Sequence, residues 1–283
     1  MDLWLIVPAK PFDEGKSRLA DTLLPSERAA VNQKMLTQVL TTATAANVFT
    51  GIIVISRSQH VLDHANKLGA IAIHETLSSA SKSSEEVDLT NLSASSIDSF
   101  KTLPSIKQHT QPRHQSDTRS DAPSCSASNF FARNAAEQRQ KTDSSLNNQA
   151  PLPALPKEYR LINALVQARQ AAVARGAEAI LVLPVDLPLL TIDDVRKLYK
   201  LGAQQRGVVI AGSQDGGTNA LLLRPPMAID FAFGTDSFQR HSALAQLRGY
   251  PCQTLQSTTL AFDLDGPEDW KRYQESVQAL LKK

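Results

Sequence analysis

Three aspartates lie within or directly after apolar stretches, where a carboxylate needs a partner. Asp263 and Asp265 are two residues apart in FDLDGPEDW, so an extended strand would point both side chains to one face. Asp186 is the single carboxylate in the apolar stretch LPVDLPLL. Carboxylates on one face suit Mg²⁺ when phosphate oxygens and water complete its shell. Together the three residues predict a two-metal site for phosphoryl or nucleotidyl transfer.

Two of these aspartates also have a structural explanation. Asp186 could cap backbone N–H groups of the turn that precedes Pro188. Asp265 could cap a helix that begins at Pro267. A cap does not account for Asp263, which lies within the apolar part of its segment, so FDLD is the sharper metal signal.

Three cations follow the first apolar run of the chain, at Lys10, Lys16 and Arg18. Fixed cations suit a triphosphate, and a guanidinium can bind two of its oxygens at once. The segment 15–17 also matches the end of the P-loop pattern, G-x-x-x-x-G-K-[ST], but Lys10 replaces the first glycine of that pattern. We therefore interpret the match as coincidental and expect side chains to hold the phosphates. A solvated basic turn is the structural alternative.

Two glycine-containing segments could hold an anionic substrate. In QDGGTN (214–219), Thr218 offers a hydroxyl beside glycines that permit close approach of a ligand. In FGTDSF (233–238), Gly234 and Ser237 precede a predicted helix, whose first N–H groups suit a carboxylate or phosphate. A hairpin turn at 215–216 and a simple helix cap are the alternative explanations.

Alternating strands and helices must position these residues. Apolar runs predict strands at 3–9, 51–56, 71–75, 179–186, 207–213, 219–226 and 258–265. Helical patterns occupy 26–46, 60–70, 158–176, 191–205, 237–249 and 267–283. This alternation indicates an α/β fold with a mainly parallel sheet. Ligands of such sheets bind beyond the carboxyl ends of the strands, which is where the candidate residues fall.

The middle of the chain has a different composition. Residues 77–156 are rich in Ser, Thr, Asn, Gln and Pro, and their apolar residues follow no helical or strand period. Such a segment buries too little apolar surface to offset its ordering entropy, so we predict a disordered insertion. A docking arm that uses Phe130-Phe131 is the functional alternative.

Charge and cysteine content exclude several classes of protein. The net charge is +2, with both signs mixed along the chain, so no field for nucleic acid is built in. Two cysteines cannot form a disulfide framework or a four-ligand zinc site. The first apolar run is too short for a leader or a membrane span. These features favour a cytoplasmic protein without a membrane or nucleic-acid partner, and they make no prediction of oligomeric state.

Several motifs occur in an order that resembles one known family. VPAKPFDEGKSRLA, LVLPVDLPLL, DGGTNALLLRPP, FAFGTDSFQRH and FDLDGPEDW are similar to segments of the coenzyme F-420 guanylyltransferases, which use 2-phospho-L-lactate or phosphoenolpyruvate. The resemblance implies one nucleotide-diphosphosugar-transferase-like, Rossmann-like α/β/α domain made of residues 1–76 and 157–283. It also implies transfer of GMP from GTP to a three-carbon phospho-acid, with release of pyrophosphate.

The resemblance further implies roles for individual residues. The Mg²⁺ ligands would be Asp186, Asp263 and Asp265. The acceptor's carboxylate would be held by Thr218, Gly234 and Ser237. The groups facing the nucleotide would be Lys10, Lys16, Arg18 and Asn163, with Lys16 and Arg18 also assisting catalysis. Leu161-Ile162 stand where the family has glycine-leucine before that asparagine.

Two other functions remain open from the sequence. One is a nucleotidyltransferase for another acceptor, such as a molybdopterin or a sugar phosphate. Those enzymes carry an L-x-G-G-x-S-x-R loop after the first strand, which PAKPFDEGKSR does not match. The other is a non-catalytic nucleotide-binding regulator whose insertion docks a partner. The presence of all three aspartates and of DGGTN argues against a regulator.

Overall fold

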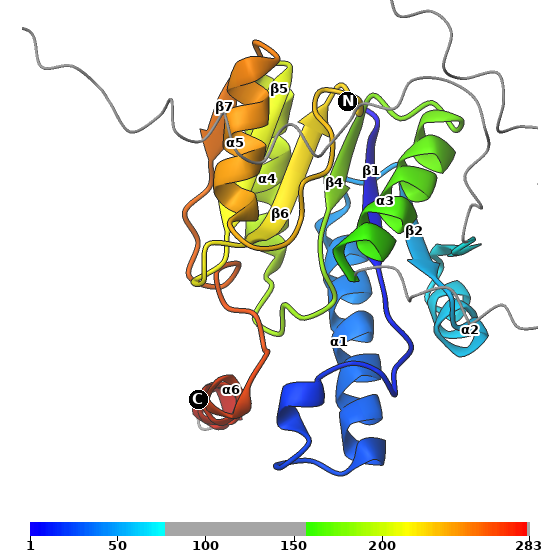
Figure 1. The fold of residues 1–283 in the computed structure, drawn as a ribbon, viewed down its shortest axis with the longest axis vertical. Helices are drawn as coiled ribbons and strands as arrows, with labels where there is room; N and C mark the ends of the chain where they lie inside the picture. The colour runs from blue at the N-terminus through cyan, green and yellow to red at the C-terminus, as the bar shows by residue number, and fades with distance from the viewer. Residues whose placement is uncertain (77–156, 282–283) are drawn as a thin grey trace, which may run out of the picture. The chain divides into compact units, whose positions relative to one another are not determined.

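A seven-stranded sheet forms the centre of the part of the chain that the computed structural model describes, residues 1–76 and 157–281 (Figure 1). Its strands are β1 (Leu3–Pro8), β2 (Gly51–Ser56), β3 (Ile71–His74), β4 (Ala179–Val182), β5 (Gly207–Gly212), β6 (Thr218–Arg224) and β7 (Cys252–Thr254). They lie in the order β3-β2-β1-β4-β6-β5-β7. Only β6 runs against its neighbours, β4 and β5, among these strands. The predicted mainly parallel α/β sheet is therefore confirmed.

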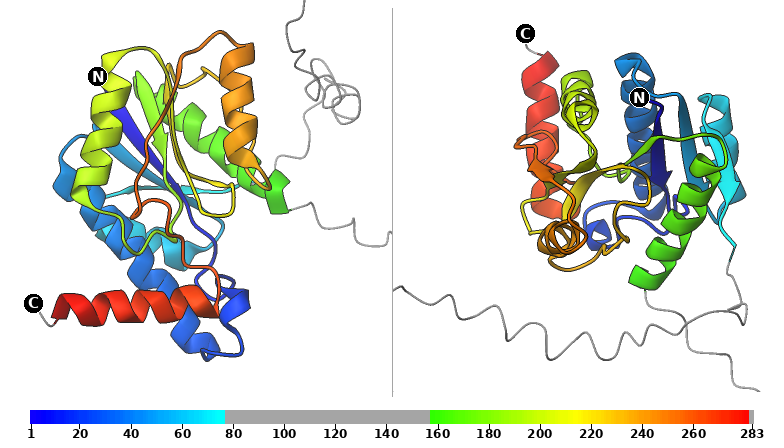
Figure 2. Two further views of the ribbon diagram at one scale, coloured as in Figure 1. Left: turned by 90° about the vertical axis from the view of Figure 1, so that its left-hand side faces the viewer. Right: turned by 90° about the horizontal axis from the view of Figure 1, so that it is seen from above.

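Helices cover both faces of the sheet. The helices of the described residues are α1 (Pro25–Ala46), α2 (Gln59–Lys67), α3 (Lys157–Val173), α4 (Ile192–Gln204), α5 (Ser237–Leu247) and α6 (Pro267–Leu281), with a 3₁₀ turn at Ser17–Leu19. Of these, α6 lies away from the sheet and packs against the cluster of Leu19, Met35 and Leu264 (Figure 1). Buried residues of α1, α2 and α4 pack on one face, and those of α3 and α5 pack on the other (Figure 2). The result is three layers, α/β/α. Among the described helices, none combines the length and apolarity that a membrane crossing requires.

The burial of β1 shows why its sequence is apolar throughout. Leu3, Leu5 and Val7 join the core on the α1 side, whereas Trp4 and Ile6 join the core on the α3 side. Successive side chains of a strand point to opposite faces, so a strand covered by helices on both faces has no polar position. This central strand therefore places the loop that begins at Ala9 at the end of the sheet where the parallel strands have their carboxyl ends.

The predicted strand at 258–265 is wrong. The chain there forms turns and irregular backbone between β7 and α6. Leu260, Phe262 and Leu264 are buried in alternation with more exposed residues, and this alternation produced the strand-like pattern. Their backbone does not join the sheet, since Leu264 N donates to Asp186 O at 3.0 Å instead. The expected insertion at 77–156 lies outside the described residues, so the division into domain and insertion stays a prediction.

Candidate active site

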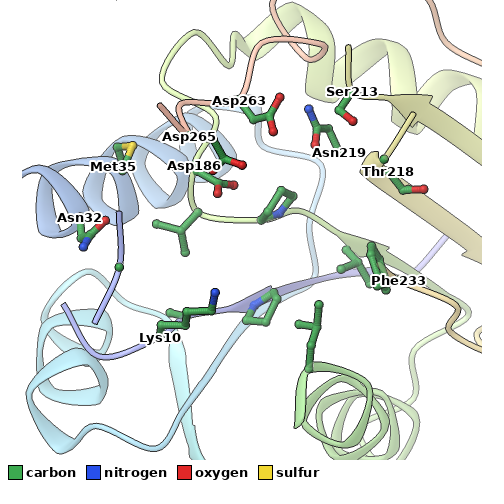
Figure 3. A pocket seen from close by; sticks show the side chains of 18 of the residues that line it. Lys10, Asn32, Met35, Asp186, Ser213, Thr218, Asn219, Phe233, Asp263 and Asp265 are labelled. Atoms are coloured by element: carbon green, nitrogen blue, oxygen red, sulfur yellow. The ribbon is translucent and has the colours of Figure 1, made fainter. Parts of the chain in front are cut away.

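A cavity of about 400 Å³ lies at the carboxyl ends of β1 and β4 (Figure 3). All of the predicted site residues except Arg18 and Asn163 line it. Thr218 is the first residue of β6, and an antiparallel strand begins at the edge where its neighbours β4 and β5 end. The sheet topology therefore brings the predicted metal ligands and the predicted acceptor residues to the same edge.

Two hydrogen bonds attach the segment that carries Asp263 and Asp265 to this edge. Leu264 N donates to Asp186 O, which joins the segment to the loop after β4. The buried Asn219 donates from Nδ2 to Leu260 O at 2.8 Å, which joins it to β6. Figure 3 shows the three aspartates together on one side of the cavity. Asp263 and Asp265 thus lie on the same side of the chain, as predicted, but irregular backbone places them there and not a strand.

Lys16 is the buried cation of the acidic cluster formed by Asp186, Asp263 and Asp265. Its side chain is 6% exposed, and Nζ lies 3.1 Å from Asp186 Oδ2 and 3.5 Å from Asp265 Oδ1. Arg18 is 75% exposed and reaches Asp265 Oδ2 at 3.7 Å. Asp186 and Asp265 are thus ion-paired, and Asp265 does not serve as the cap that its position before α6 had suggested, because Asp269 accepts from the backbone there.

Asp263 differs from the other two aspartates because no cation contacts it among the described residues. Burial, and then the charges of Asp186 and Asp265, raise the pKa of its carboxyl to about 6. Within residues 1–76 and 157–281, no three His, Cys, Asp or Glu side chains converge closely enough to hold a metal ion as they stand. Three carboxylates against the two cations Lys16 and Arg18 nevertheless leave an excess of negative charge that suits a divalent cation.

The loop before Lys16 has a structural reason for its glycine. A Cβ on Gly15 would lie 2.4 Å from Asn32 Nδ2, and that amide donates to Phe12 O at 2.6 Å. The close approach of the loop to α1 therefore requires glycine. This agrees with the interpretation that GKS at 15–17 matches the P-loop pattern by coincidence.

The side of the cavity with the predicted acceptor residues, called the acceptor side below, is a buried network of neutral groups. Ser237 Oγ donates to Thr218 Oγ1 at 3.1 Å, and His241 Nδ1 lies 3.1 Å from the same oxygen. His241 is fully buried, and its Nε2 accepts from Ala232 N at 2.9 Å. Burial, and then the charge of Arg240, lower the pKa of His241 to about 4. Sequence reasoning missed His241, although it lies one helical turn after Ser237, on the same face of α5.

Gly234 occupies a position on the cavity wall that other residues tolerate poorly. Its φ is +117°, and a Cβ would lie 3.0 Å from Arg240 Nη2 and 3.1 Å from Glu158 Cγ. Its carbonyl accepts from Ser237 N at 3.2 Å, which sets the start of α5. Glycine is therefore favoured here by the backbone conformation and by the lack of room for a Cβ beside Arg240 and Glu158.

A second cavity, of about 660 Å³, adjoins the first on the β2 side. The two share Lys10, Lys16 and Asp265 in their linings. Further cations line the second cavity, namely Arg18, Arg57 and Arg160. Sequence reasoning missed the last two, although Arg57 directly follows β2 and the strand-end rule would have found it. Three carboxylates also line this cavity, at Glu14, Glu75 and Asp265, and Glu14 pairs with Arg57. The five cations still leave a net positive lining, which suits a polyphosphate.

Asn163 lies apart from both cavities. It is on α3, and its Nδ2 donates to Thr76 O at 3.0 Å. The same carbonyl accepts from Gln167 Nε2 at 2.7 Å. Its amide nitrogen thus fixes the chain just after β3, and its expected contact with the nucleotide stays a prediction.

Comparison with solved structures gives the class of fold. A crystal structure from Desulfovibrio desulfuricans G20, assigned to the nucleotide-diphospho-sugar transferases, matches with a TM-score of 0.52 and 12% identity. The match covers 94% of this chain and 84% of that one. The chain thus has the fold of the nucleotide-diphospho-sugar transferases, as the motifs implied.

Comparison with protein families is more specific. Residues 3–109 and 138–273 match the model of the family described as Guanylyl transferase CofC like, and the chain belongs to this family. A phosphoenolpyruvate guanylyltransferase of Sphaerobacter thermophilus is 29% identical over 265 residues, which cover 93% of this chain and 88% of that protein. Family and fold together identify a nucleotidyltransferase.

Two further relatives match over shorter segments. A phosphoenolpyruvate guanylyltransferase of Rubrobacter xylanophilus is 39% identical over 141 residues, 45% of this chain and 69% of that protein. A 3-phospho-D-glycerate guanylyltransferase of Colwellia psychrerythraea is 37% identical over 89 residues, 31% of this chain and 42% of that protein. The names of the relatives thus include two different acceptors, both of which are phospho-acids.

Proposed function

We propose that this chain transfers GMP from GTP to the phosphate of phosphoenolpyruvate and releases pyrophosphate, a cytoplasmic step of coenzyme F-420 biosynthesis. The observation that carries the proposal is one cavity with an acidic, cation-paired side and a neutral hydroxyl-bearing side. The relatives named as phosphoenolpyruvate guanylyltransferases support this acceptor. 2-Phospho-L-lactate is the other acceptor that the motifs suggest.

The reaction needs little from the protein except positioning and charge. The acceptor's phosphate is already an anion at neutral pH, so no general base is required. One of its oxygens attacks the α-phosphorus of GTP, a new P–O bond forms, and the bond to the β-phosphate breaks to release pyrophosphate. The difficulty is the repulsion between two anions, and Lys10, Lys16 and Arg18 would offset it.

The acidic cluster would hold Mg²⁺, with Asp186, Asp263 and Asp265 as ligands, and we propose that two ions bind. Bound Mg²⁺ would neutralise phosphate charge and orient the phosphates. Asp186 and Asp265 are now paired with Lys16, so metal binding requires Lys16 to release them. Its ammonium would then be free to pair with the triphosphate.

The neutral side would bind the acceptor's carboxylate. Thr218 and Ser237 border the cavity with hydroxyl groups, and Gly234 leaves its backbone accessible there. A carboxylate accepts several hydrogen bonds and needs no charged partner if donors surround it.

Pyrophosphate release and product mass test the proposal. The purified chain is incubated with Mg²⁺, GTP and one acceptor: phosphoenolpyruvate, 2-phospho-L-lactate or 3-phospho-D-glycerate. We expect release with phosphoenolpyruvate, none without an acceptor, and much less when CTP replaces GTP. The product should have the mass of GMP joined to the acceptor through a phosphoanhydride. Release only with a sugar phosphate or molybdopterin would overturn the acceptor, and no release with any of them would favour a regulator.

A further inference from the structure

A chain of hydrogen bonds connects the backbone at Ala232 with the cavity through His241. Ala232 N lies 2.9 Å from His241 Nε2, and His241 Nδ1 lies 3.1 Å from Thr218 Oγ1. A backbone N–H can only donate, so Nε2 must be the unprotonated nitrogen of the ring. The neutral ring then carries its hydrogen on Nδ1, and this hydrogen is donated to Thr218 Oγ1.

The surroundings of His241 favour the neutral ring. The side chain is fully buried, and the ring of Phe233 packs edge-on against it with centroids 4.8 Å apart. An imidazolium would carry a hydrogen on Nε2, pointing at the N–H of Ala232. Burial and nearby Arg240 lower the pKa of His241 to about 4, so the ring is uncharged at neutral pH.

The hydrogen bonds of Thr218 leave it one free group. Its Oγ1 receives a hydrogen bond from His241 Nδ1 and another from Ser237 Oγ. A hydroxyl has two lone pairs and one hydrogen, so both lone pairs are used. No acceptor for the remaining hydrogen lies among the described residues, and Thr218 borders the 400 Å³ cavity. What this hydroxyl can offer a ligand is therefore a donor.

We infer that His241 is a positioning residue that makes the Thr218 hydroxyl a fixed hydrogen-bond donor to the acceptor's carboxylate. The inference rests on the proposed function, in which the acceptor is a phospho-acid. A carboxylate has only lone pairs to offer, so it matches a site whose hydroxyl can only donate. An analogue with a hydroxymethyl group in place of the carboxylate loses the charge-assisted part of this bond.

Two substitutions of His241 separate donation from packing. In His241→Asn, the amide nitrogen can take the place of Nδ1 and donate to Thr218, but nothing accepts from Ala232. In His241→Gln, the amide oxygen can take the place of Nε2 and accept from Ala232, but nothing donates to Thr218. Both variants remove the ring and leave one hydrogen bond unmade, so they are matched in structural damage.

The expected readout is a change in one Michaelis constant. We expect the KM for phosphoenolpyruvate to rise about tenfold in His241→Gln and by no more than about threefold in His241→Asn, since one misdirected bond to a charged group is at stake. The KM for GTP should be unchanged in both variants. Equal KM values for phosphoenolpyruvate in the two variants would overturn the inference.

A second measurement requires neither turnover nor a variant. NMR spectra of the wild-type chain labelled with ¹⁵N-histidine report which ring nitrogen of His241 carries hydrogen. We expect hydrogen on Nδ1 alone at pH 7, and hydrogen on Nε2 would overturn the inference even if both variants failed to fold. If the wild type releases no pyrophosphate with any phospho-acid, the proposed function fails, and the NMR result still decides the state of His241.

Discussion

The side chains on the two sides of the cavity make different kinds of contact with one another. On the acidic side, Lys16 and Arg18 pair with Asp186 and Asp265, and three of these four side chains are at least one-third exposed. On the acceptor side, Thr218, Ser237 and His241 are buried and joined by hydrogen bonds between neutral groups. The acidic side thus consists of ion-paired side chains that can change partners, and the acceptor side consists of a fixed hydrogen-bond network.

This difference teaches how each side would meet its substrate. The pair between the exposed Arg18 and Asp265 is weak, and the two carboxylates that pair with the buried Lys16 are themselves partly exposed, so both carboxylates can exchange these partners for a metal. A buried network that is already ordered loses little entropy when a ligand arrives. We therefore expect mutations on the acidic side to change turnover and use of GTP, and mutations on the acceptor side to change the KM of the acceptor.

Asp263→Asn should have the largest effect. It removes a proposed metal ligand, and we expect kcat to fall by at least about 1,000-fold, the upper range for loss of one preorganised electrostatic group. Asp215→Asn is the control, because Asp215 also lines the cavity but its carboxylate accepts from Gly217 N and Ser213 Oγ in the hairpin turn. A loss of the same size in both variants, measured by pyrophosphate release, would erase the distinction between the two carboxylates.

Lys16→Gln should rank second. Loss of the buried cation should lower kcat/KM for GTP about 100-fold, as expected for a charge-assisted contact to phosphate. Arg18→Gln removes an exposed cation of the same cluster, and we expect a loss of about tenfold or less. Steady-state kinetics with varied GTP measure both. If Arg18→Gln proved the more damaging, the interpretation based on burial would be wrong.

Lowering the pH should have a smaller effect than these substitutions, and it should change the Mg²⁺ requirement of the acidic side only. The pKa of Asp263 is about 6, so a proton competes with Mg²⁺ below that pH. We expect the Mg²⁺ concentration for half-maximal activity to rise by up to about tenfold per pH unit below 6. His241, with a pKa of about 4, should stay neutral over pH 5–8. NMR titration of His241 near pH 6 would contradict this contrast.

Thermal unfolding in EDTA tests the same two pKa shifts, with opposite signs. The pKa of Asp263 is raised on folding, so its ionised form disfavours the folded state above pH 6, and this penalty fades as the pH falls towards 4. Asp263→Asn should therefore raise Tm by a few degrees at pH 7.5 and by only about a third as much at pH 4.5. The pKa of His241 is lowered on folding, so between pH 6.5 and 4 the unfolded state binds a proton that the folded state does not. The free energy of unfolding therefore decreases as the pH falls through this range.

Asn163→Ala should have the smallest effect. The amide nitrogen already donates to Thr76 O, and the residue lines neither cavity. We expect the KM for GTP to change less than about threefold, with a small loss of stability from one exposed hydrogen bond. A tenfold rise in that KM would instead support the nucleotide contact that the family resemblance implies.

The order of strands and helices was predictable, except for β7 (Cys252–Thr254), because buried segments have recognisable apolar patterns in the sequence. The apolar run at 3–9 predicts β1 since both faces of that strand are covered. The segment 258–265 also has a strand-like apolar pattern, because its alternate residues are buried. Its backbone nevertheless donates to Asp186 O and does not pair with a strand. Periodicity reports burial, and only the hydrogen-bond partners decide whether a buried segment is a strand.

The site was predictable where residue type alone carries the chemistry. Asp186, Asp263 and Asp265 were found because carboxylates within apolar segments at strand ends require an explanation. The pairing of Lys16 with Asp186 was not predictable, because 170 residues separate them in the chain. Nor was the ring state of His241, which depends on a backbone N–H at Ala232 and leaves no trace in residue type.

The reversed direction of β6 has a consequence for how this enzyme family can diversify. Thr218 is the first residue of β6, directly after the turn that connects β5 and β6, whereas the loops that carry Lys16 and Asp186 follow other strands. A substitution next to this turn can alter the proposed acceptor pocket while the parts proposed for the nucleotide keep their sequence. If Thr218 binds the acceptor as proposed, the choice of acceptor can change without any change in the nucleotide-binding residues.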